Sequence, residues 1–229
     1  MIRAIIVVVF WAVAIPLAAI VCFPWTLITR KIDFLYNTAM KIARIGVRLG
    51  GVKVAIVGLE RFDNQGTYIY MCNHVSNIDP PIVIPAIPKR TSVLVKKEVF
   101  RIPVLATAMR MGSLVPVDRT DRDSAITSLK KAQEVLASGV NMTVFPEGTR
   151  SQTGELLPLK KGPFYMALES GVSIVPMTIL NTKAIWPKGR FAINPGTATV
   201  VFHSPVDPRQ FLDRDALVEA VRQSIASAM

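Results

Sequence analysis

Residues 67–81 read TYIYMCNHVSNIDPP, an apolar run followed at once by turn residues and a pair of prolines. The run TYIYMCN (67–73) is rich in apolar and aromatic residues and is typical of a strand. The following SNIDPP is typical of a turn, and Asp79 before Pro80 predicts a helix N-cap with proline at the first helical position. This stretch therefore predicts a strand, a short loop and a helix in direct succession.

The same alternation of strands and helices continues through the rest of the chain. Three helices are predicted at 123–139, 162–171 and 214–229, the first with Asp121 or Asp123 as N-cap and Gly139 as its stop. Seven short apolar runs are predicted as strands: 52–58, 67–73, 91–97, 113–119, 141–147, 172–179 and 197–203. This order is typical of an α/β domain with a mostly buried central sheet flanked by helices, which we expect over residues 51–229.

The N-terminal segment is apolar throughout. Residues 4–28 carry no charged side chain and are long enough to cross a bilayer, although Pro16 and Pro24 interrupt them. A kinked span and a helical hairpin that dips into one leaflet are both consistent with this pattern. We find no convincing A-x-A cleavage site and expect the segment to stay attached.

The next segment, 32–49, has apolar residues at three- and four-residue spacing and basic residues elsewhere, as in an amphipathic helix. Such a helix suits the lipid headgroup layer, and a helix that packs on the core with a solvated basic face is the alternative. We therefore expect residues 1–50 to form N-terminal membrane-anchoring helices. By the positive-inside rule, we expect residues 30–229 on the cytoplasmic side of the membrane.

The composition limits the partners. Of the 229 residues, 51% are hydrophobic and 19% charged, and the net charge is +11. Residues 30–110 carry 13 Lys and Arg against 5 Asp and Glu, so +8 of that charge lies beside the apolar segment, which favours an anionic membrane surface. Nucleic acid is not an expected partner, because aromatic residues do not interleave with the basic ones.

Several common kinds of site have no support in the sequence. Cys22, Cys72, His74 and His203 lack the paired spacing of a zinc site, so we expect no metal. No G-x-x-x-x-G-K-[ST], G-x-G-x-x-G or G-x-S-x-G motif occurs, which leaves nucleotide cradles and the α/β-hydrolase nucleophile without local support.

His74 and Asp79 are the first candidates for catalysis. Two residues five apart on a helix are rotated by about 140°, so these side chains meet only across a turn. The SNIDPP segment supplies that turn, and a carboxylate that accepts the proton of one imidazole nitrogen leaves the other nitrogen free as a base. From this motif alone, a solvated histidine with Asp79 acting only as a cap is the alternative interpretation.

A second motif, FPEGTRS (145–151), ends another predicted strand. Its glycine, hydroxyl and arginine are the groups from which proteins build anion sites, with Arg150 as the clamp. Arg119 ends the predicted strand 113–119 and is expected to reach the same crevice, because ligands bind beyond the carboxyl ends of strands in open α/β sheets. A plain surface charge is the alternative for each arginine.

These motifs together resemble those of the glycerolipid acyltransferases. NHVSNID resembles the N-H-x-x-x-x-D signature of that family, and FPEGTRS matches a second signature. KEVFRIPVLATAMRMGSLVPVDR (97–119) resembles the block between them, and IVPMTI (174–179) resembles a fourth, which would line the acyl channel or support the sheet. The chain length and apolar N-terminus are similar to those of the bacterial 1-acylglycerol-3-phosphate acyltransferases.

The resemblance implies transfer of a fatty acyl group to the sn-2 hydroxyl of 1-acyl-sn-glycerol-3-phosphate, giving phosphatidic acid at the membrane. The implied partners are the bilayer, the lysophospholipid acceptor and an acyl donor, either acyl-CoA or acyl-carrier protein. His74 is implied as the general base and Asp79 as the residue that orients it. The resemblance implies no cofactor, metal or covalent acyl-enzyme.

The substrate-binding residues implied by the resemblance surround the second motif: Arg150, Arg119, Glu147, Gly148, Thr149 and Lys97. Both arginines would hold the acceptor phosphate, Glu147 would shape the loop, and Lys97 would meet the phosphate or the donor. Another acceptor, such as a lyso-ornithine lipid, is an alternative within the same class of enzyme. A catalytically silent membrane-binding module that retains the fold is the alternative from a different class.

Overall fold

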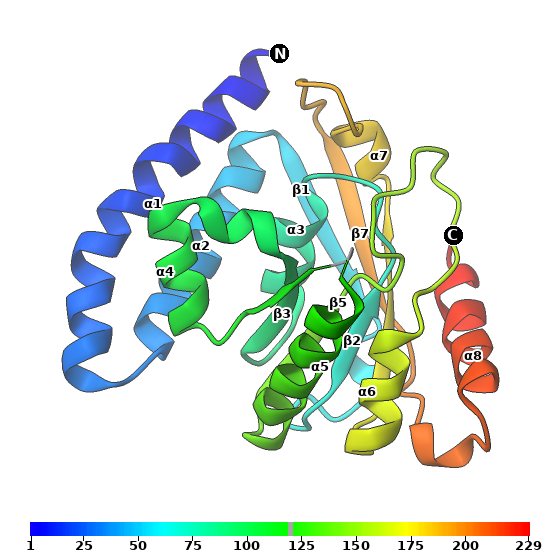
Figure 1. Ribbon diagram of the computed structural model, residues 1–229. Helices are drawn as coiled ribbons and strands as arrows, with labels where there is room; N and C mark the ends of the chain where they lie inside the picture. Colours follow the sequence, from blue (N-terminus) through cyan, green and yellow to red (C-terminus); the bar gives the residue numbers. More distant parts are fainter. Residues whose placement is uncertain (119–120) are drawn as a thin grey trace.

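All seven predicted strands are present within a few residues of their predicted bounds, and they form one sheet (Figure 1). The structure is a computed structural model that describes residues 1–118 and 121–229. The strands are β1 (Val52–Val57), β2 (Ile69–Cys72), β3 (Thr91–Lys96), β4 (Val115–Val117), β5 (Asn141–Val144), β6 (Ile174–Leu180) and β7 (Gly196–Phe202).

The strand order places several loops at one edge of the sheet. The order is β1-β7-β6-β2-β5-β3-β4, and every neighbouring pair is parallel except β6 and β7. The five strands β2 to β6 therefore run in one direction and end at the same edge. In open α/β sheets, this is the edge at which ligands bind.

The three helices predicted with both of their bounds within the α/β region are confirmed with small changes at their ends. They are α5 (Arg122–Ala137), α6 (Gly162–Ser170) and α8 (Arg214–Ala226). The remaining elements are α3 (Asp79–Ala86), α4 (Pro103–Met111), α7 (Thr182–Ile185) and the short 3₁₀ segments η1 (Leu59–Arg61), η2 (Lys97–Arg101) and η3 (Pro208–Gln210). No helix was predicted at α4 or α7.

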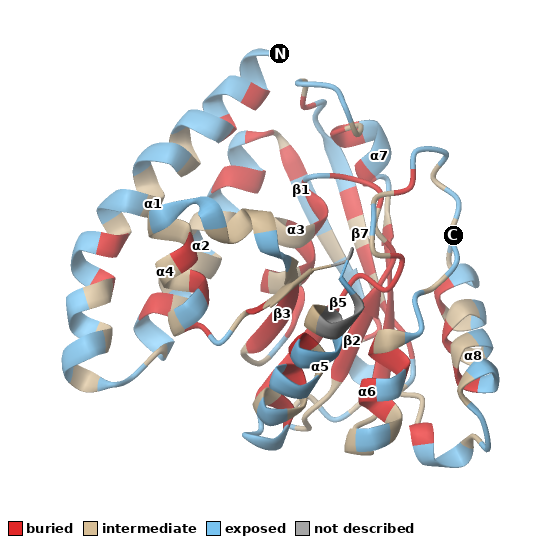
Figure 2. Cartoon of the chain, in the orientation of Figure 1, coloured by how far each residue is buried: buried red, intermediate tan, exposed pale blue. Residues whose placement is uncertain are grey.

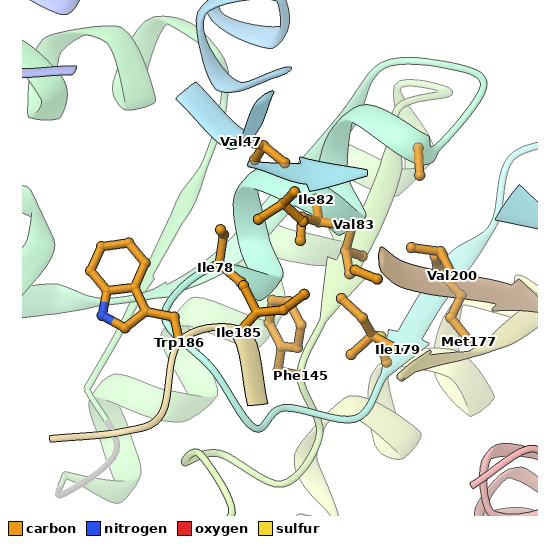
Figure 3. Close-up of a cluster of buried hydrophobic side chains, with 14 of the residues drawn as sticks. Val47, Ile78, Ile82, Val83, Phe145, Met177, Ile179, Ile185, Trp186 and Val200 are labelled. Atoms are coloured by element: carbon orange, nitrogen blue, oxygen red, sulfur yellow. The ribbon is translucent and has the colours of Figure 1, made fainter. Parts of the chain in front are cut away.

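Side chains that alternate along the strands build a core on each face of the sheet. In β2, Ile69 and Met71 face the helices α5, α6 and α8, whereas Tyr70 and Cys72 face α3. Figure 2 shows the central strands buried between two layers of helix, with the edge strand β1 more exposed, and Figure 3 shows part of the core on the α3 side. The expected architecture, a mostly buried central sheet flanked by helices, is confirmed.

The N-terminal segment forms a helical hairpin beside the sheet. The helix α1 (Ile2–Thr29) continues through Pro16 and Pro24, and α2 (Asp33–Leu49) returns along it. Among the described residues, α1 is the one helix long and apolar enough to cross a membrane. The indole of Trp11 packs on Gly46 and donates to the Ile42 carbonyl at 3.3 Å, so the two helices are in close contact.

Candidate active site

The two sequence motifs lie next to each other because their strands are neighbours. In the parallel pair β2–β5, Met71 lies opposite Val144, so the two strands end at the same level. His74 and Glu147 each stand three residues beyond that pair. The sheet register therefore brings together two loops that are more than 70 residues apart in the sequence.

His74 and Asp79 meet across the predicted turn. Their Nδ1 and Oδ2 atoms are 2.7 Å apart, and the Asp79 side chain is fully buried while the His74 side chain is 15% exposed. The imidazole also lies against the ring of Phe145, with 4.4 Å between centroids. With Nδ1 donating to the carboxylate, the lone pair of Nε2 is left available as a base.

The predicted capping role of Asp79 is wrong. The helix α3 begins at Asp79 itself, and no side chain caps its N-terminus. The Asp79 carboxylate instead reaches back to the preceding loop, where Oδ2 accepts from the backbone N–H groups of Val75 and Ser76 at 2.7 Å each. These bonds fix the loop on which His74 stands. The interpretation of Asp79 as only a cap is therefore excluded.

Glu147 is buried and bonds to backbone rather than facing an open site. Its side chain is 1% exposed, Oε1 accepts from the His74 N–H at 2.6 Å, and Oε2 accepts from the Leu157 N–H at 2.9 Å. Burial raises the pKa of Glu147 and the Asp79 charge raises it further, whereas these two hydrogen bonds and the charge of Arg222 lower it. Its position is that of a brace between loops, away from any substrate.

Other residues of the FPEGTRS loop face a cavity. Gly148, Thr149 and Arg150 line its wall together with His74. Gly148 has a φ of 71°, a conformation that favours glycine, and its N–H closes a tight turn to the Phe145 carbonyl at 3.0 Å. The Arg150 guanidinium donates to the Asn77 side chain, so a residue of the first motif holds the arginine of the second.

Lys97, another predicted ligand of the phosphate or of the donor, does not belong to the cavity wall. Lys97 forms an ion pair with Asp118 that joins the ends of β3 and β4, and this bond raises the pKa of Lys97. Lys96, which was not a predicted ligand, lines the cavity instead. Arg119 lies outside the described residues.

The cavity has a volume of about 790 Å³ and is largely apolar. Its wall includes α1, α2, α4 and almost the whole of β3, from Thr91 at one end to Lys96 at the other. At ~3.3 Å per residue these ends are roughly 17 Å apart. Met71 lies opposite Val144 and Val93 opposite Thr143, so His74, three residues beyond Met71, stands near the Lys96 end of this wall.

The IVPMTI block supports the sheet, and it is held by Asn73, a contact that was not predicted. The block forms most of β6, and none of its residues belongs to the cavity wall. Asn73, next to His74, accepts from the Ile179 N–H at 2.7 Å and donates to the Ile179 carbonyl at 3.1 Å. Asn73 thus ties the His74 loop to β6. A polar residue at the end of a buried strand is the signal that could have identified Asn73.

The described residues contain no group of three or more His, Cys, Asp and Glu side chains placed to hold a metal ion. The second histidine, His203, is buried elsewhere, with Nε2 2.9 Å from the Thr178 hydroxyl. Cys72 is also buried, and burial raises the pKa of its thiol.

Comparisons with known proteins agree with the motifs and the fold. Residues 53–180 match the family model described as Acyltransferase. A 1-acyl-sn-glycerol-3-phosphate acyltransferase of Limnanthes douglasii is 34% identical over 202 residues, which are 88% of this chain and 70% of that protein. One of Borreliella burgdorferi is 31% identical over 163 residues, 71% of this chain and 65% of that protein.

A solved structure matches nearly the whole chain. The crystal structure of the 1-acyl-sn-glycerophosphate (LPA) acyltransferase PlsC from Thermotoga maritima has a TM-score of 0.82 and is 26% identical. The match covers 99% of this chain and 95% of that chain, so it includes the N-terminal hairpin as well as the sheet.

Proposed function

The chain belongs to the acyltransferase family, and on that premise we propose that it acylates the sn-2 hydroxyl of 1-acyl-sn-glycerol-3-phosphate to give phosphatidic acid. The observation that carries the proposal is that His74 and Arg150 share the wall of one apolar cavity. A base, a cation and an apolar space suit the three parts of the reaction: a hydroxyl to activate, a phosphate to hold and a fatty chain to bury.

In the proposed reaction, His74 is the general base. Asp79 holds Nδ1, so Nε2 takes the proton of the acceptor hydroxyl as that oxygen attacks the thioester carbonyl carbon. Asp79 stabilises the imidazolium that forms. The tetrahedral intermediate then collapses, the C–S bond breaks, and the imidazolium returns its proton to the leaving sulfur.

Direct attack by the acceptor is favoured over an acyl-cysteine or acyl-serine intermediate, because the cysteine and the serine of the His74 loop are buried. The Cys72 thiol is buried and its pKa is raised well above the usual value, which disfavours the thiolate. The buried Ser76 hydroxyl donates to the Trp186 carbonyl at 2.6 Å. The proposed reaction needs no metal and no cofactor.

The apolar cavity is the proposed site of a fatty chain. An extended peptide advances at most ~3.3–3.6 Å over its three backbone bonds per residue, or roughly 1.2 Å per bond. A space that follows β3 for roughly 17 Å therefore matches an extended chain of about fourteen bonds. Arg150 at the rim is the proposed ligand of the acceptor phosphate, and the donor is proposed to be acyl-CoA or acyl-carrier protein.

The geometry of the α1–α2 hairpin supports association with one leaflet of a membrane. Residue Gly51, where the hairpin joins the sheet, lies against the Arg3 side chain, so both ends of the hairpin are on the same side. The α1 helix exposes many large apolar side chains, among them Ile2, Val9 and Ile20. We propose that α1 and α2 insert into one leaflet, because a full span would draw α2 and the adjoining sheet domain into the hydrocarbon. The cytoplasmic face of the inner membrane is the proposed location.

The test is acyl transfer by detergent-solubilised protein to 1-acylglycerol-3-phosphate, with acyl-CoA and acyl-carrier protein offered in parallel. A lyso-ornithine lipid serves as the phosphate-free acceptor, and His74→Ala as the inactive control. Phosphatidic acid from the wild type, and none from the variant, is the expected result. Transfer to the phosphate-free acceptor alone would overturn the proposed acceptor and retain the class of reaction.

A further inference from the structure

Glu147 grips the backbone of His74. Oε1 accepts from the His74 N–H at 2.6 Å, and the same FPEGTRS loop returns through Ser151, whose N–H donates to the His74 carbonyl at 2.8 Å. Both backbone groups of His74 are therefore held by one loop, while Asp79 holds its side chain. Glu147 has no place in the cavity wall, so its carboxylate is not presented to a substrate.

The second carboxylate oxygen of Glu147 bonds to a different part of the chain. Oε2 accepts from the Leu157 N–H at 2.9 Å, on the segment that leads into α6. Two backbone donors, one on each oxygen, favour the ionised carboxylate, because hydrogen bonds to a charged acceptor are stronger. An ionised group that is 1% exposed needs such partners, since burial disfavours its charge.

Arg222 of the C-terminal helix α8 contacts the segment that contains Leu157. Its Nη1 lies 3.5 Å from the carbonyl oxygens of both Leu156 and Leu157, and its positive charge acts on Glu147. The helix is fixed in the core by Leu217, Val221 and Ile225, all fully buried. Arg222 also lies outside residues 53–180, which match the family model.

We propose that Glu147 is a positioning residue that fixes the backbone of His74, and that Arg222 acts on the active site through Glu147. The proposal rests on the proposed function, in which His74 is the base. A base that moves by about 1 Å can lose on the order of 10²-fold in rate, so an anchor on its backbone acts on turnover. A residue that bound the acceptor phosphate would instead act on its affinity.

The experiment compares kcat and KM for 1-acylglycerol-3-phosphate in the full chain carrying Glu147→Gln, Arg222→Met or both. Glutamine keeps the shape of the side chain but cannot accept from both N–H groups. We expect Glu147→Gln to lower kcat about 10²-fold, with KM within about 2-fold of wild type. We expect Arg222→Met to lower kcat about 3–10-fold, and the double variant to be no worse than Glu147→Gln alone.

Two variants serve as references. Arg150→Ala, at the cavity rim, is expected to raise KM, which gives the pattern of a substrate-binding residue in the same assay. Arg214→Met removes an arginine from the first turn of α8, where it bonds to Asp215 and Tyr165, and is expected to leave kcat and KM unchanged.

Three outcomes would overturn the proposal: a rise in KM with kcat retained in Glu147→Gln, unchanged kinetics in that variant, or multiplicative losses in the double variant. Thermal unfolding of each variant shows whether it is folded. If Glu147→Gln fails to fold, Arg222→Met decides, because a loss confined to kcat supports the proposal and an unchanged kcat refutes it. A wild type that acylates no lysolipid would instead refute the proposed function.

Discussion

The two faces of the sheet are covered by similar apolar side chains, yet one is filled and the other is partly hollow. Beneath α5, α6 and α8, residues such as Phe164, Met166 and Leu217 are fully buried against the strands. On the opposite face, α3 packs closely on β2 and β6. Residues of α1, α2 and α4 together with β3 instead line a cavity of about 790 Å³. Protein interiors are close-packed, so empty space of this size indicates a site rather than a packing fault.

The largest expected effect on activity is at Asp79, which holds the His74 side chain beside the cavity. Asp79→Asn leaves the side-chain shape intact but removes the negative charge that stabilises the imidazolium, and a neutral amide oxygen in the place of Oδ2 is a weaker acceptor for the three N–H donors that meet it. We expect kcat to fall about 10²–10⁴-fold, the range of a lost general base. Steady-state acyl transfer measures this, with Asp63→Asn in an exposed turn as control. A loss below 10-fold would contradict the proposed role of the pair.

The second prediction concerns the filled face. Phe164 in α6 is fully buried, so Phe164→Ala leaves a cavity and is expected to destabilise the fold by about 3–5 kcal/mol. At ~2–4 °C per kcal/mol for a chain of this size, thermal unfolding of the detergent-solubilised protein detects the change. The preference among acyl-donor chain lengths is expected to stay the same. A changed preference would mean that the two faces are not independent.

The filled face is the part of the fold that the sequence predicts well. Alternating strands such as 67–73 and helices with a buried stripe such as 214–229 are determined by side-chain period, and their positions were correct within a few residues. The hollow half was not predicted, because apolar periodicity is the same whether a face packs closely or encloses space. The sequence also does not determine whether the α1 helix packs on the protein, spans a membrane or inserts into one leaflet. Its apolar composition suits all three, and the outcome depends on what the helix contacts.

The candidate site divides in the same way. The turn that brings His74 to Asp79 is local and was expected, because SNIDPP forbids a continuous helix between them. The bond from His74 to Glu147 joins residues 73 positions apart and depends on the register of β2 against β5, which no local pattern gives. The ion pair of Lys97 was not predicted for the same reason, because its partner Asp118 follows a different strand, β4.

The third prediction concerns a substitution that narrows the cavity over β3. Ala108 of α4 lines the cavity, on the helix that ends beside the start of β3. Ala108→Phe is expected to lower kcat/KM for a sixteen-carbon donor by roughly 10-fold or more, since each excluded methylene forfeits about 0.8 kcal/mol of burial. Transfer from a ten-carbon donor is expected to be retained.

The matched control is the same substitution on the filled face. Ala132 of α5 is fully buried, so Ala132→Phe is expected to cost about 1–3 kcal/mol of stability through overpacking. Competition between the two donors in one reaction measures the preference without depending on the amount of active protein. An equal shift in both variants would show that the cavity over β3 does not hold the acyl chain.

The smallest prediction contrasts the two histidines. His203 is sealed against α8, where its Nε2 contacts the Thr178 hydroxyl that in turn donates to the Ile225 carbonyl. Burial lowers the pKa of His203, and the charge of Arg61 lowers it further. Since the unfolded state then binds more protons, stability is present above the unfolded pKa of about 6.5 and falls as the pH drops below it.

One proton accounts for at most about 1.4 kcal/mol per pH unit, so the effect is modest. Denaturant unfolding at pH 7 and pH 5 measures it, and His203→Gln is expected to remove part of the loss because a neutral amide still donates to Thr178. Acyl transfer at pH 7.5 is expected to be unchanged in this variant, since His203 lies away from the cavity. If His203→Gln instead abolished transfer while remaining folded, the second histidine would belong to the chemistry and the contrast between the two faces would fail.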